Sequence, residues 1–216
     1  MMKGINAAII ALVLVSVLAS VVAYQFLPEK IVSHWNIYGN ADSQMDKAFA
    51  LSIMPIVAIF IAALYFLIPK LDPLRQNIKK FEFQYGLMFA TIIAFMLYIH
   101  IITILWNLGF SLNISAAIIP GVALLLFVIG LLLKDSERNW FVGVRTPWTL
   151  SSDNVWKKTH LLASKTFMIA GVILLLSIFF PEYAFFAIIF VVLIAAIIPT
   201  IYSYFEYAKE KNPKKS

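Results

Sequence analysis

Residues 114–133 read ISAAIIPGVALLLFVIGLLL, an unbroken apolar run without a charged side chain. An α-helix needs about 20 mostly apolar residues to cross the hydrocarbon core of a bilayer, and this run supplies them. Five stretches of similar character lie before and after it: Ile5–Leu27, Ala48–Ile68, Tyr85–Leu108, Leu161–Phe180 and Tyr183–Phe205. The pattern predicts an all-α, polytopic membrane protein with six transmembrane helices.

The overall composition indicates the same class. Hydrophobic residues make up 62% of the 216 residues, and charged residues only 13%. A soluble domain is about half apolar, so a water-soluble fold of this length could not cover so much apolar surface. The chain has no cysteine, which excludes disulfides, thiolate metal ligands and a cysteine nucleophile.

The distribution of basic residues predicts the orientation. With the N-terminus placed in the cytoplasm, only Lys30 and Lys47 of the 17 Lys and Arg residues fall on the outer side. Short cytoplasmic loops of membrane proteins carry an excess of Lys and Arg, and this excess determines which way the helices cross. We therefore expect the N- and C-termini to be cytoplasmic. The net charge of +6 then belongs to the cytoplasmic face and requires no nucleic-acid partner.

The predicted spans carry little chemistry. None of them contains Asp, Glu or Arg, whereas coupled transporters and proton pumps place ionisable groups near mid-membrane. We interpret His100 as a residue that hydrogen-bonds between helices rather than as a proton relay. The fifth span is the least regular, because its uncharged part, Thr166–Phe180, is short. Its helix could begin anywhere between Trp156 and Thr166, with Lys165 reaching the headgroups.

One polar loop, residues 28–47, is predicted on the outer side and reads PEKIVSHWNIYGNADSQMDK. It is rich in turn-forming residues, and three interpretations stay open. His34, Asp42 and Asp46 could ligate a metal ion, although no sequence spacing makes them a chelate. The loop could be a compact lid in which Asp42 or Ser43 caps the next helix. It could also be a docking surface for a peptide or small molecule from outside.

A second polar loop, residues 134–165, is predicted on the cytoplasmic side. Its first part, Asn139–Leu150, is rich in β-forming residues and turns, and Ser151 or Ser152 can cap a helix that starts near Asp153. Tryptophans beside Lys and Arg are typical of a segment at an anionic leaflet. A protein partner that docks here and a loop that only lies along the membrane are equally consistent with this composition.

The same loop does not predict an enzyme. Ser151 and Ser152 lie near Asp153 and His160, but Asp153 and His160 share one short helix, and a catalytic triad needs convergent geometry. No metalloprotease, paired-carboxylate or phosphate-loop pattern occurs in the chain. We expect no catalytic residue, no bound metal and no cofactor.

The two loops divide the chain into two units. Residues 1–69 are predicted to form a two-helix unit with the outer loop 28–47, and residues 70–216 a four-helix unit with the cytoplasmic loop 134–165. Because membrane helices pack closely against one another, we expect both units to form one integrated bundle.

The cytoplasmic loop resembles a known signature. The segment NWFVGVRTPWTLSSDNVWKKTH, residues 139–160, is similar to the pattern N-x-x-x-G-[IV]-R-T-P-W-T-L…W-x-x-[ST]-H of the sporulation-delaying-protein immunity family. The matching residues are Asn139, Gly143, Arg145, Thr146, Pro147, Trp148, Thr149, Leu150, Trp156 and His160. Two tryptophans and a histidine within this run make the signal specific.

The outer loop resembles a domain of unknown function, DUF1648, which is often found at the N-terminus of these proteins. Its pattern has the form L-P-x-x-I-P-x-H-[WF]-N-x-x-G-x-x-D. The matching residues are Leu27, Pro28, Ile31, His34, Trp35, Asn36, Gly39 and Asp42, followed by Lys47. Val32 stands where the family usually has proline. The two motifs and the spans between them cover most of the chain.

The resemblance implies a function that composition cannot supply. Members of the family protect a producing bacterium from a secreted antimicrobial peptide that collapses the membrane potential, and some also hold a transcriptional repressor at the membrane. We therefore expect a multi-pass protein of a bacterial cell membrane, whose partners are the lipid bilayer, an extracellular peptide toxin and a cytoplasmic repressor. The outer motif residues would face the toxin, and the cytoplasmic motif residues would face the repressor. The alternatives are a small-solute membrane transporter and a metal-dependent membrane enzyme.

Overall fold

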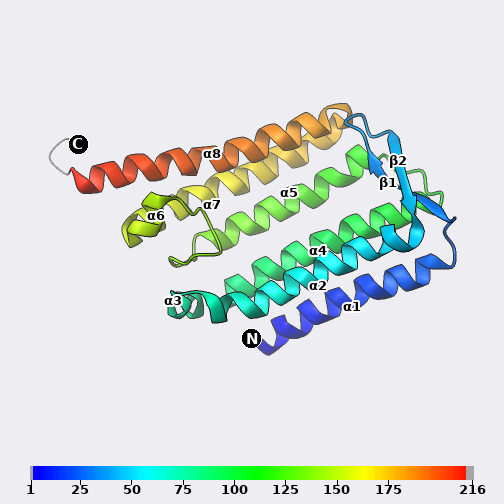
Figure 1. The fold of residues 1–216 in the computed structure, drawn as a ribbon. Helices are drawn as coiled ribbons and strands as arrows, with labels where there is room; N and C mark the ends of the chain where they lie inside the picture. The colour runs from blue at the N-terminus through cyan, green and yellow to red at the C-terminus, as the bar shows by residue number, and fades with distance from the viewer. Residues whose placement is uncertain (1, 213–216) are drawn as a thin grey trace.

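The computed structural model describes residues 2–212 and contains six long helices that run side by side (Figure 1). They are α1 (Met2–Tyr24), α2 (Lys47–Leu71), α4 (Glu82–Asn107), α5 (Ile114–Leu133), α7 (Asp153–Leu176) and α8 (Ala184–Lys211). The connections contain β1 (Lys30–Trp35), β2 (Ala41–Asp46), α3 (Arg75–Lys80), α6 (Pro147–Ser151) and the 3₁₀ turns η1 (Ser177–Phe179) and η2 (Pro181–Tyr183). Six helices are long and apolar enough to cross a membrane. The predicted six-helix membrane fold is confirmed, with one small hairpin added.

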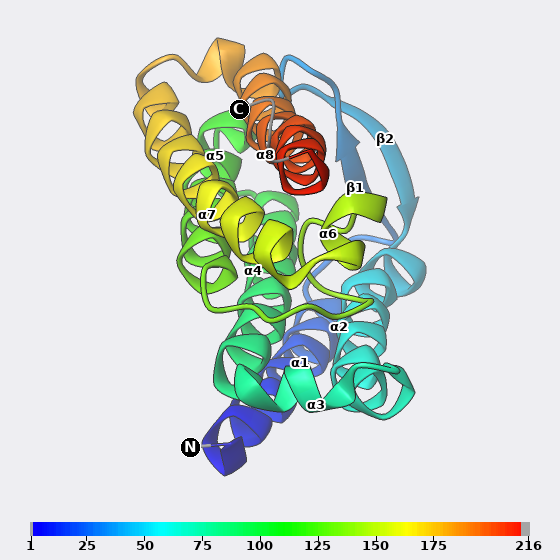
Figure 2. The same cartoon turned by 90° about the vertical axis from the view of Figure 1, so that its left-hand side faces the viewer.

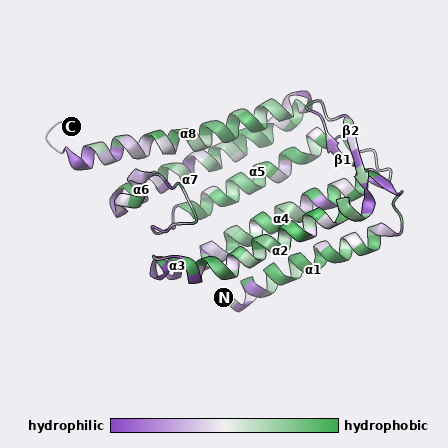
Figure 3. Cartoon of the chain, in the orientation of Figure 1, coloured by the Kyte–Doolittle hydropathy of each residue, from purple (hydrophilic) through white to green (hydrophobic). Residues whose placement is uncertain are grey.

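The long helices expose large apolar side chains on their outer surface. Leu14, Phe60, Leu124 and Phe190, which come from four different helices, are each more than 60% exposed. Figure 3 shows hydrophobic residues along the whole length of the helices and hydrophilic residues at their ends. An apolar surface of this extent far exceeds the patches that soluble monomers expose, so its solvent is lipid.

Buried residues divide the helices into two groups. One cluster, which includes Ile9, Tyr65 and Tyr85, holds α1, α2 and α4 together. A second cluster, which includes Ile119 and Leu174, holds α5, α7 and α8 together. Helix α4 also packs against α5 and so joins the two groups. The division of the chain into units 1–69 and 70–216 stays a prediction from the sequence.

The two ends of the bundle differ. Helix α1 begins and α8 ends at the same end, where α3 and α6 also lie (Figures 1 and 2). We call this the inner end. The opposite end, called the outer end, carries the hairpin of β1 and β2. An even number of crossings places both helix termini on one side, and that this side is the cytoplasm stays a prediction from the charges.

The outer loop folds as an antiparallel β-hairpin, in which Lys30 lies opposite Asp46 and Trp35 opposite Ala41. We call residues 30–46 the outer hairpin. The interpretation that Asp42 or Ser43 caps the next helix is wrong, because both residues lie within β2. Asp46 is the cap of α2, and its Oδ1 accepts a hydrogen bond from the backbone N–H of Ala48 at 2.8 Å.

The connection between α5 and α7, residues 134–152, is called the inner loop. The predicted β character of Asn139–Leu150 is wrong, because this segment consists of bends followed by α6. The predicted cap is confirmed, since Ser152 Oγ accepts a hydrogen bond from the backbone N–H of Val155 at 3.2 Å. Helix α7 begins at Asp153, before the predicted window of Trp156 to Thr166, because the short helix predicted near Asp153 and the membrane span are one continuous helix.

His100 joins three helices of the first group. Its Nε2 lies 2.8 Å from the Oγ of Ser20 on α1, and Ser20 Oγ donates to the carbonyl of Leu51 on α2 at 2.8 Å. The side chain of His100 is buried, at 2% exposure. This contact confirms the interpretation of His100 as a hydrogen-bonding residue between helices.

Candidate functional site

His34 and Asp42 face each other across the outer hairpin. His34 Nδ1 lies 2.6 Å from Asp42 Oδ1, and the two side chains are 67% and 41% exposed. Asp46, the third predicted ligand, serves as the cap of α2. Within residues 2–212, no group of three His, Asp or Glu side chains is arranged to hold a metal ion. His34 and Asp42 form an exposed polar pair that a molecule on the outer side can reach.

Asn36 and Gly39 shape the turn of the outer hairpin. Asn36 Oδ1 accepts hydrogen bonds from the backbone N–H of Tyr38 at 2.9 Å and of Asn40 at 3.1 Å. Gly39 has a φ of +79°, and a Cβ at this position would lie 2.7 Å from Ser115 Oγ on α5. A larger residue would therefore strain the turn and push it away from α5. These two motif residues fix the position of the hairpin.

The base of the outer hairpin is anchored by Asn107 and Lys47. Asn107 of α4 accepts from the N–H of Val32 at 2.8 Å and donates to its carbonyl at 2.9 Å, as a neighbouring strand would. Lys47 is nearly buried, and its Nζ donates to the carbonyl of Leu27 at 3.2 Å and pairs with Glu29 at 3.1 Å. The motif lysine thus helps to hold the base of the hairpin, and its ammonium group is already occupied by these contacts.

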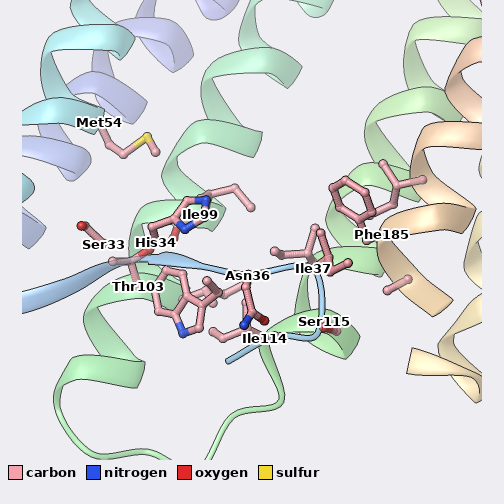
Figure 4. Close-up of a pocket in the computed structure, with 16 residues that line it drawn as sticks. Ser33, His34, Asn36, Ile37, Met54, Ile99, Thr103, Ile114, Ser115 and Phe185 are labelled. Carbon is pink, nitrogen blue, oxygen red and sulfur yellow. Dashed lines mark hydrogen bonds between the residues drawn. The ribbon is translucent and has the colours of Figure 1, made fainter. Parts of the chain in front are cut away.

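A cavity of about 300 Å³ lies beneath the outer hairpin (Figure 4). Residues 33–37 of the hairpin cover it, and its walls come from α2, α4, α5 and α8, through residues such as Met54, Ile99 and Phe185. Trp35, which lines the cavity, packs edge-on against Trp106 with ring centroids 5.5 Å apart. Of the remaining outer motif residues, Ile31 is buried at 1% exposure and Pro28 is exposed just before β1.

Asn139 organises the first turn of the inner loop from a fully buried position. Its Oδ1 accepts hydrogen bonds from the backbone N–H of Phe141 at 2.9 Å and of Val142 at 2.7 Å. Its Nδ2 donates to the carbonyls of Glu137 at 2.9 Å and Val142 at 3.0 Å. Four bonds from one amide leave it no capacity for a partner, so its role is to hold the loop.

His160 of α7 packs against Gly143 and Val144 of the inner loop. His160 Nδ1 lies 2.9 Å from the carbonyl of Trp156, so Nδ1 must carry the proton that is donated there. Its Nε2 accepts a hydrogen bond from the backbone N–H of Val144 at 3.0 Å. This pairing defines a neutral imidazole. Gly143 has a φ of +113°, and a Cβ there would collide with the His160 ring, so this position requires glycine.

The tryptophan of the same motif completes this buried core. The Trp156 ring stacks on His160 with centroids 4.0 Å apart, and its Nε1 donates to the carbonyl of Ser136 at 2.9 Å. Both rings have no solvent exposure. Trp156 and His160 therefore act as internal supports of the inner loop.

Thr146 and Thr149 form a reciprocal capping box that starts α6, with Pro147 at its first position. Thr146 Oγ1 also lies 3.0 Å from Ser203 Oγ, which ties α6 to α8. Trp148 packs edge-on against Tyr204 of α8, with centroids 5.2 Å apart. These contacts explain why a short helix of five residues is stable at this place.

The exposed part of the inner loop is formed by other side chains. Trp140 is 50% exposed and Phe141 is 38% exposed, and Arg145 and Pro147 are exposed beside them. Arg145 Nη1 donates to the carbonyl of Trp140 at 2.8 Å, which fixes the guanidinium against the loop. We call Trp140, Phe141, Arg145 and Pro147 the inner patch. The motif signature contains only two of its four members.

Two polar residues outside both motifs attach the inner loop to the first helix group. Asp72, just after α2, is 2% exposed, and it accepts from the N–H of Trp140 at 2.9 Å and of Leu74 at 2.6 Å. Asn77 of α3 donates to the carbonyl of Arg138 at 2.8 Å. We had not predicted either residue. The only signal for Asp72 is that a carboxylate directly follows an apolar span.

The serines and acids near α7 do not converge on His160. Ser152 Oγ donates to Glu210 Oε2 at 2.9 Å, and Asp153 pairs with Arg138 at 2.6 Å. A further ion pair joins Lys158 of α7 to Glu206 of α8. These polar contacts fasten α7 to α8 and to the inner loop and do not assemble a nucleophile with a base.

Comparison with known proteins relates both motifs to families. Residues 136–203 match the SdpI/YfhL protein family, and residues 11–59 match a domain of unknown function, DUF1648. The chain is 32% identical to "Immunity protein SdpI" of Bacillus subtilis (strain 168) over 205 residues, which cover 93% of this chain and 94% of that protein. No solved structure matches the chain. On the strength of the full-length similarity and the family match that contains the inner motif, the chain belongs to the SdpI immunity-protein family.

Proposed function

We propose that this protein lies in a bacterial cell membrane and protects the cell from a secreted antimicrobial peptide. In this proposal the outer hairpin faces the peptide, and the inner patch faces a cytoplasmic partner, a transcriptional repressor. The observation that carries the proposal is the similarity to an immunity protein along nearly the whole chain, including both motifs. The proposal requires no catalytic step.

The arrangement of the two ends supports this division. The outer end offers the exposed pair His34–Asp42 and an apolar cavity beneath it. The inner end offers an apolar and cationic surface in Trp140, Phe141 and Arg145. Aromatic and arginine side chains are the types most enriched in protein interfaces, which favours a protein partner for the inner patch.

A continuous element joins the two ends. Strand β2 ends at Asp46, which itself caps α2, so the outer hairpin runs into the helix without a linker. Helix α2 has 25 residues and spans about 37 Å. At its far end Asp72 binds the N–H of Trp140 in the inner patch. A shift of the hairpin on peptide binding would therefore move the attachment point of the inner loop, which is how a receptor could signal across the membrane.

Protection is tested by expressing the chain in a sensitive bacterium. The cells are exposed to the peptide fraction secreted by a bacterium that carries this gene, and survival and membrane potential are measured. Cells that carry the chain should keep their potential at peptide concentrations that depolarise cells carrying an empty vector or an unrelated six-helix membrane protein. Equal depolarisation in all three would overturn the proposed function.

Orientation is tested in the same cells, because the chain has no native cysteine. Ser43→Cys lies on the outer hairpin and Ser151→Cys on α6, and both positions are exposed. A membrane-impermeant maleimide should label only the first variant in intact cells and both after lysis. Labelling of Ser151→Cys alone in intact cells would reverse the proposed orientation.

A further inference from the structure

We propose that the cavity beneath the outer hairpin binds an uncharged apolar residue of a peptide, whose backbone carbonyl accepts a hydrogen bond from the indole N–H of Trp35. The inference rests on the proposed function for the source of the peptide, which is the secreted antimicrobial. The chemistry of the ligand is argued from the cavity itself.

The size and walls of the cavity suit one apolar side chain with its adjoining peptide group. An apolar cavity of about 150 Å³ already binds benzene, and this one has about 300 Å³. Isoleucines from three helices dominate its walls: Ile99, Ile102, Ile114, Ile118 and Ile188. Small-molecule and side-chain pockets share this combination of apolar walls and a few polar groups.

The charge of the lining favours an uncharged ligand. His34 is the only titratable residue among those that line the cavity, and its Nδ1 is already engaged by Asp42. Among residues 2–212 no Lys or Arg lines it, and Lys47 at the base of the hairpin is held by Glu29 and a backbone carbonyl. A phosphate headgroup requires such a cation, so the cavity does not suit the head of an anionic lipid.

Two polar atoms in the cover of the cavity point to a hydrogen-bond acceptor in the ligand. Trp35 Nε1 and Ser33 Oγ are buried, and within residues 2–212 neither has a hydrogen-bond partner. Buried polar groups in native proteins are nearly always paired. Both atoms are covered in this structure, so an acceptor on the ligand reaches Trp35 Nε1 when the indole turns toward it. A peptide carbonyl can accept from Trp35, whereas the hydrocarbon tail of a lipid cannot. This difference favours a peptide.

The rim explains how an apolar residue would enter. Ile37 of the outer hairpin is 37% exposed and Phe185 of α8 is 43% exposed, and both line the cavity (Figure 4). The rim therefore joins the hairpin, which is anchored on the first helix group, to α8 of the second. An occupant would contact both groups and change how they sit against each other at the outer end.

The indole N–H is tested with Trp35→Phe, which removes the donor and keeps an aromatic ring. Because Trp35 Nε1 has no partner in the protein, this change breaks no existing hydrogen bond. We expect the thermal unfolding temperature to be unchanged and the protective effect in cells to fall about five- to tenfold, as the loss of one hydrogen bond to the peptide requires. Trp106→Phe is the matched control, because Trp106 packs on Trp35 but does not line the cavity. Full protection by Trp35→Phe would contradict the proposed bond.

The cavity is tested directly with two single-cysteine variants in lipid nanodiscs. Ser115→Cys lines the cavity, whereas Ser52→Cys lies at the outer end of α2 outside it. Alkylation by N-phenylmaleimide is timed with N-acetylphenylalanine amide or N-acetyllysine amide present at the same millimolar concentration. The phenylalanine amide alone should slow alkylation of Ser115→Cys, by at least about threefold, and should leave Ser52→Cys unchanged.

The outcomes separate the cavity from the proposed function. The peptide pocket is overturned if neither amide changes the alkylation rate of Ser115→Cys, or if only the lipid composition changes it. This holds even if the chain protects cells. Slowing by the phenylalanine amide in a chain that protects no cells supports the pocket and overturns the immunity function as its biological role.

Discussion

The outer hairpin and helix α7, against which the inner loop packs, each carry one motif histidine, and the structure uses the two in opposite ways. His34 is 67% exposed, and its Nδ1 pairs with Asp42. His160 has no exposure, and both of its ring nitrogens are bound by backbone groups. A residue that belongs to a motif is therefore not always one that a partner can reach. The outer motif presents one polar pair, His34 and Asp42, to solvent. Most of the inner motif builds the frame on which other side chains are exposed.

The largest expected effect follows from breaking that inner frame with His160→Ala. The change leaves the N–H of Val144 without a partner, removes the imidazole bond to the carbonyl of Trp156 and opens a cavity beside the Trp156 ring. Together these should lower the free energy of unfolding by about 3 kcal/mol. Denaturant titration of the purified protein in detergent measures this loss. His34→Ala is the matched control and should change the free energy of unfolding by less than about 0.5 kcal/mol; equal losses for both histidines would remove the contrast between the two ends.

A smaller effect is expected where the inner loop is attached to α2. Asp72→Ala leaves the N–H groups of Trp140 and Leu74 without an acceptor in a buried place, which should cost about 2 kcal/mol. Hydrogen exchange followed by mass spectrometry should show faster exchange in residues 136–145 and no change in the outer hairpin. Asp72→Asn keeps an acceptor oxygen for one of the two N–H groups and should restore only part of the protection from exchange. If Asp72→Ala leaves exchange at Trp140 unchanged, Asp72 is not the attachment point.

The outer hairpin has its own attachment, and Asn107→Ala should release it at a cost of about 1 kcal/mol. The substitution removes the two hydrogen bonds to Val32 but leaves Ile31 and Lys47 in place. We expect faster hydrogen exchange throughout residues 30–46. Exchange in the inner loop should stay unchanged, in contrast to the effect of Asp72→Ala. Faster exchange in both the outer hairpin and the inner loop would show that Asn107 does not hold the hairpin alone.

The long helices could be predicted from the sequence because each apolar run is as long as a bilayer is thick. The continuation of the helix that starts at Asp153 into the fifth span could not, because Lys157, Lys158 and Lys165 interrupt the hydropathy signal while the helix continues through them. Lys158 is accommodated by Glu206, which lies 48 residues further along the chain. The hydropathy of a segment shows where it can enter lipid and says little about where its helix begins.

The roles of the motif residues were harder to predict than their identity. The resemblance identified His160 and Asn139 as important, but their burial depends on backbone groups of the inner loop that no local pattern reveals. The hairpin was missed for a related reason. Its edge is paired by Asn107, which lies 75 residues away from Val32 in the chain. The exposed members of the inner patch, Trp140 and Phe141, were not among the predicted partner-facing residues.

The central claim, that the outer hairpin meets the peptide and the inner loop meets a cytoplasmic partner, is tested most directly by comparing His34→Ala with Arg145→Ala. Both side chains are exposed, so neither change should unfold the bundle. The membrane potential of sensitive cells is measured during exposure to the secreted peptide, at matched amounts of each variant in the membrane. The account predicts depolarisation at severalfold lower peptide concentrations for His34→Ala than for the unchanged chain, and an unchanged response for Arg145→Ala. Unchanged protection by His34→Ala, or loss of protection by Arg145→Ala alone, would contradict it.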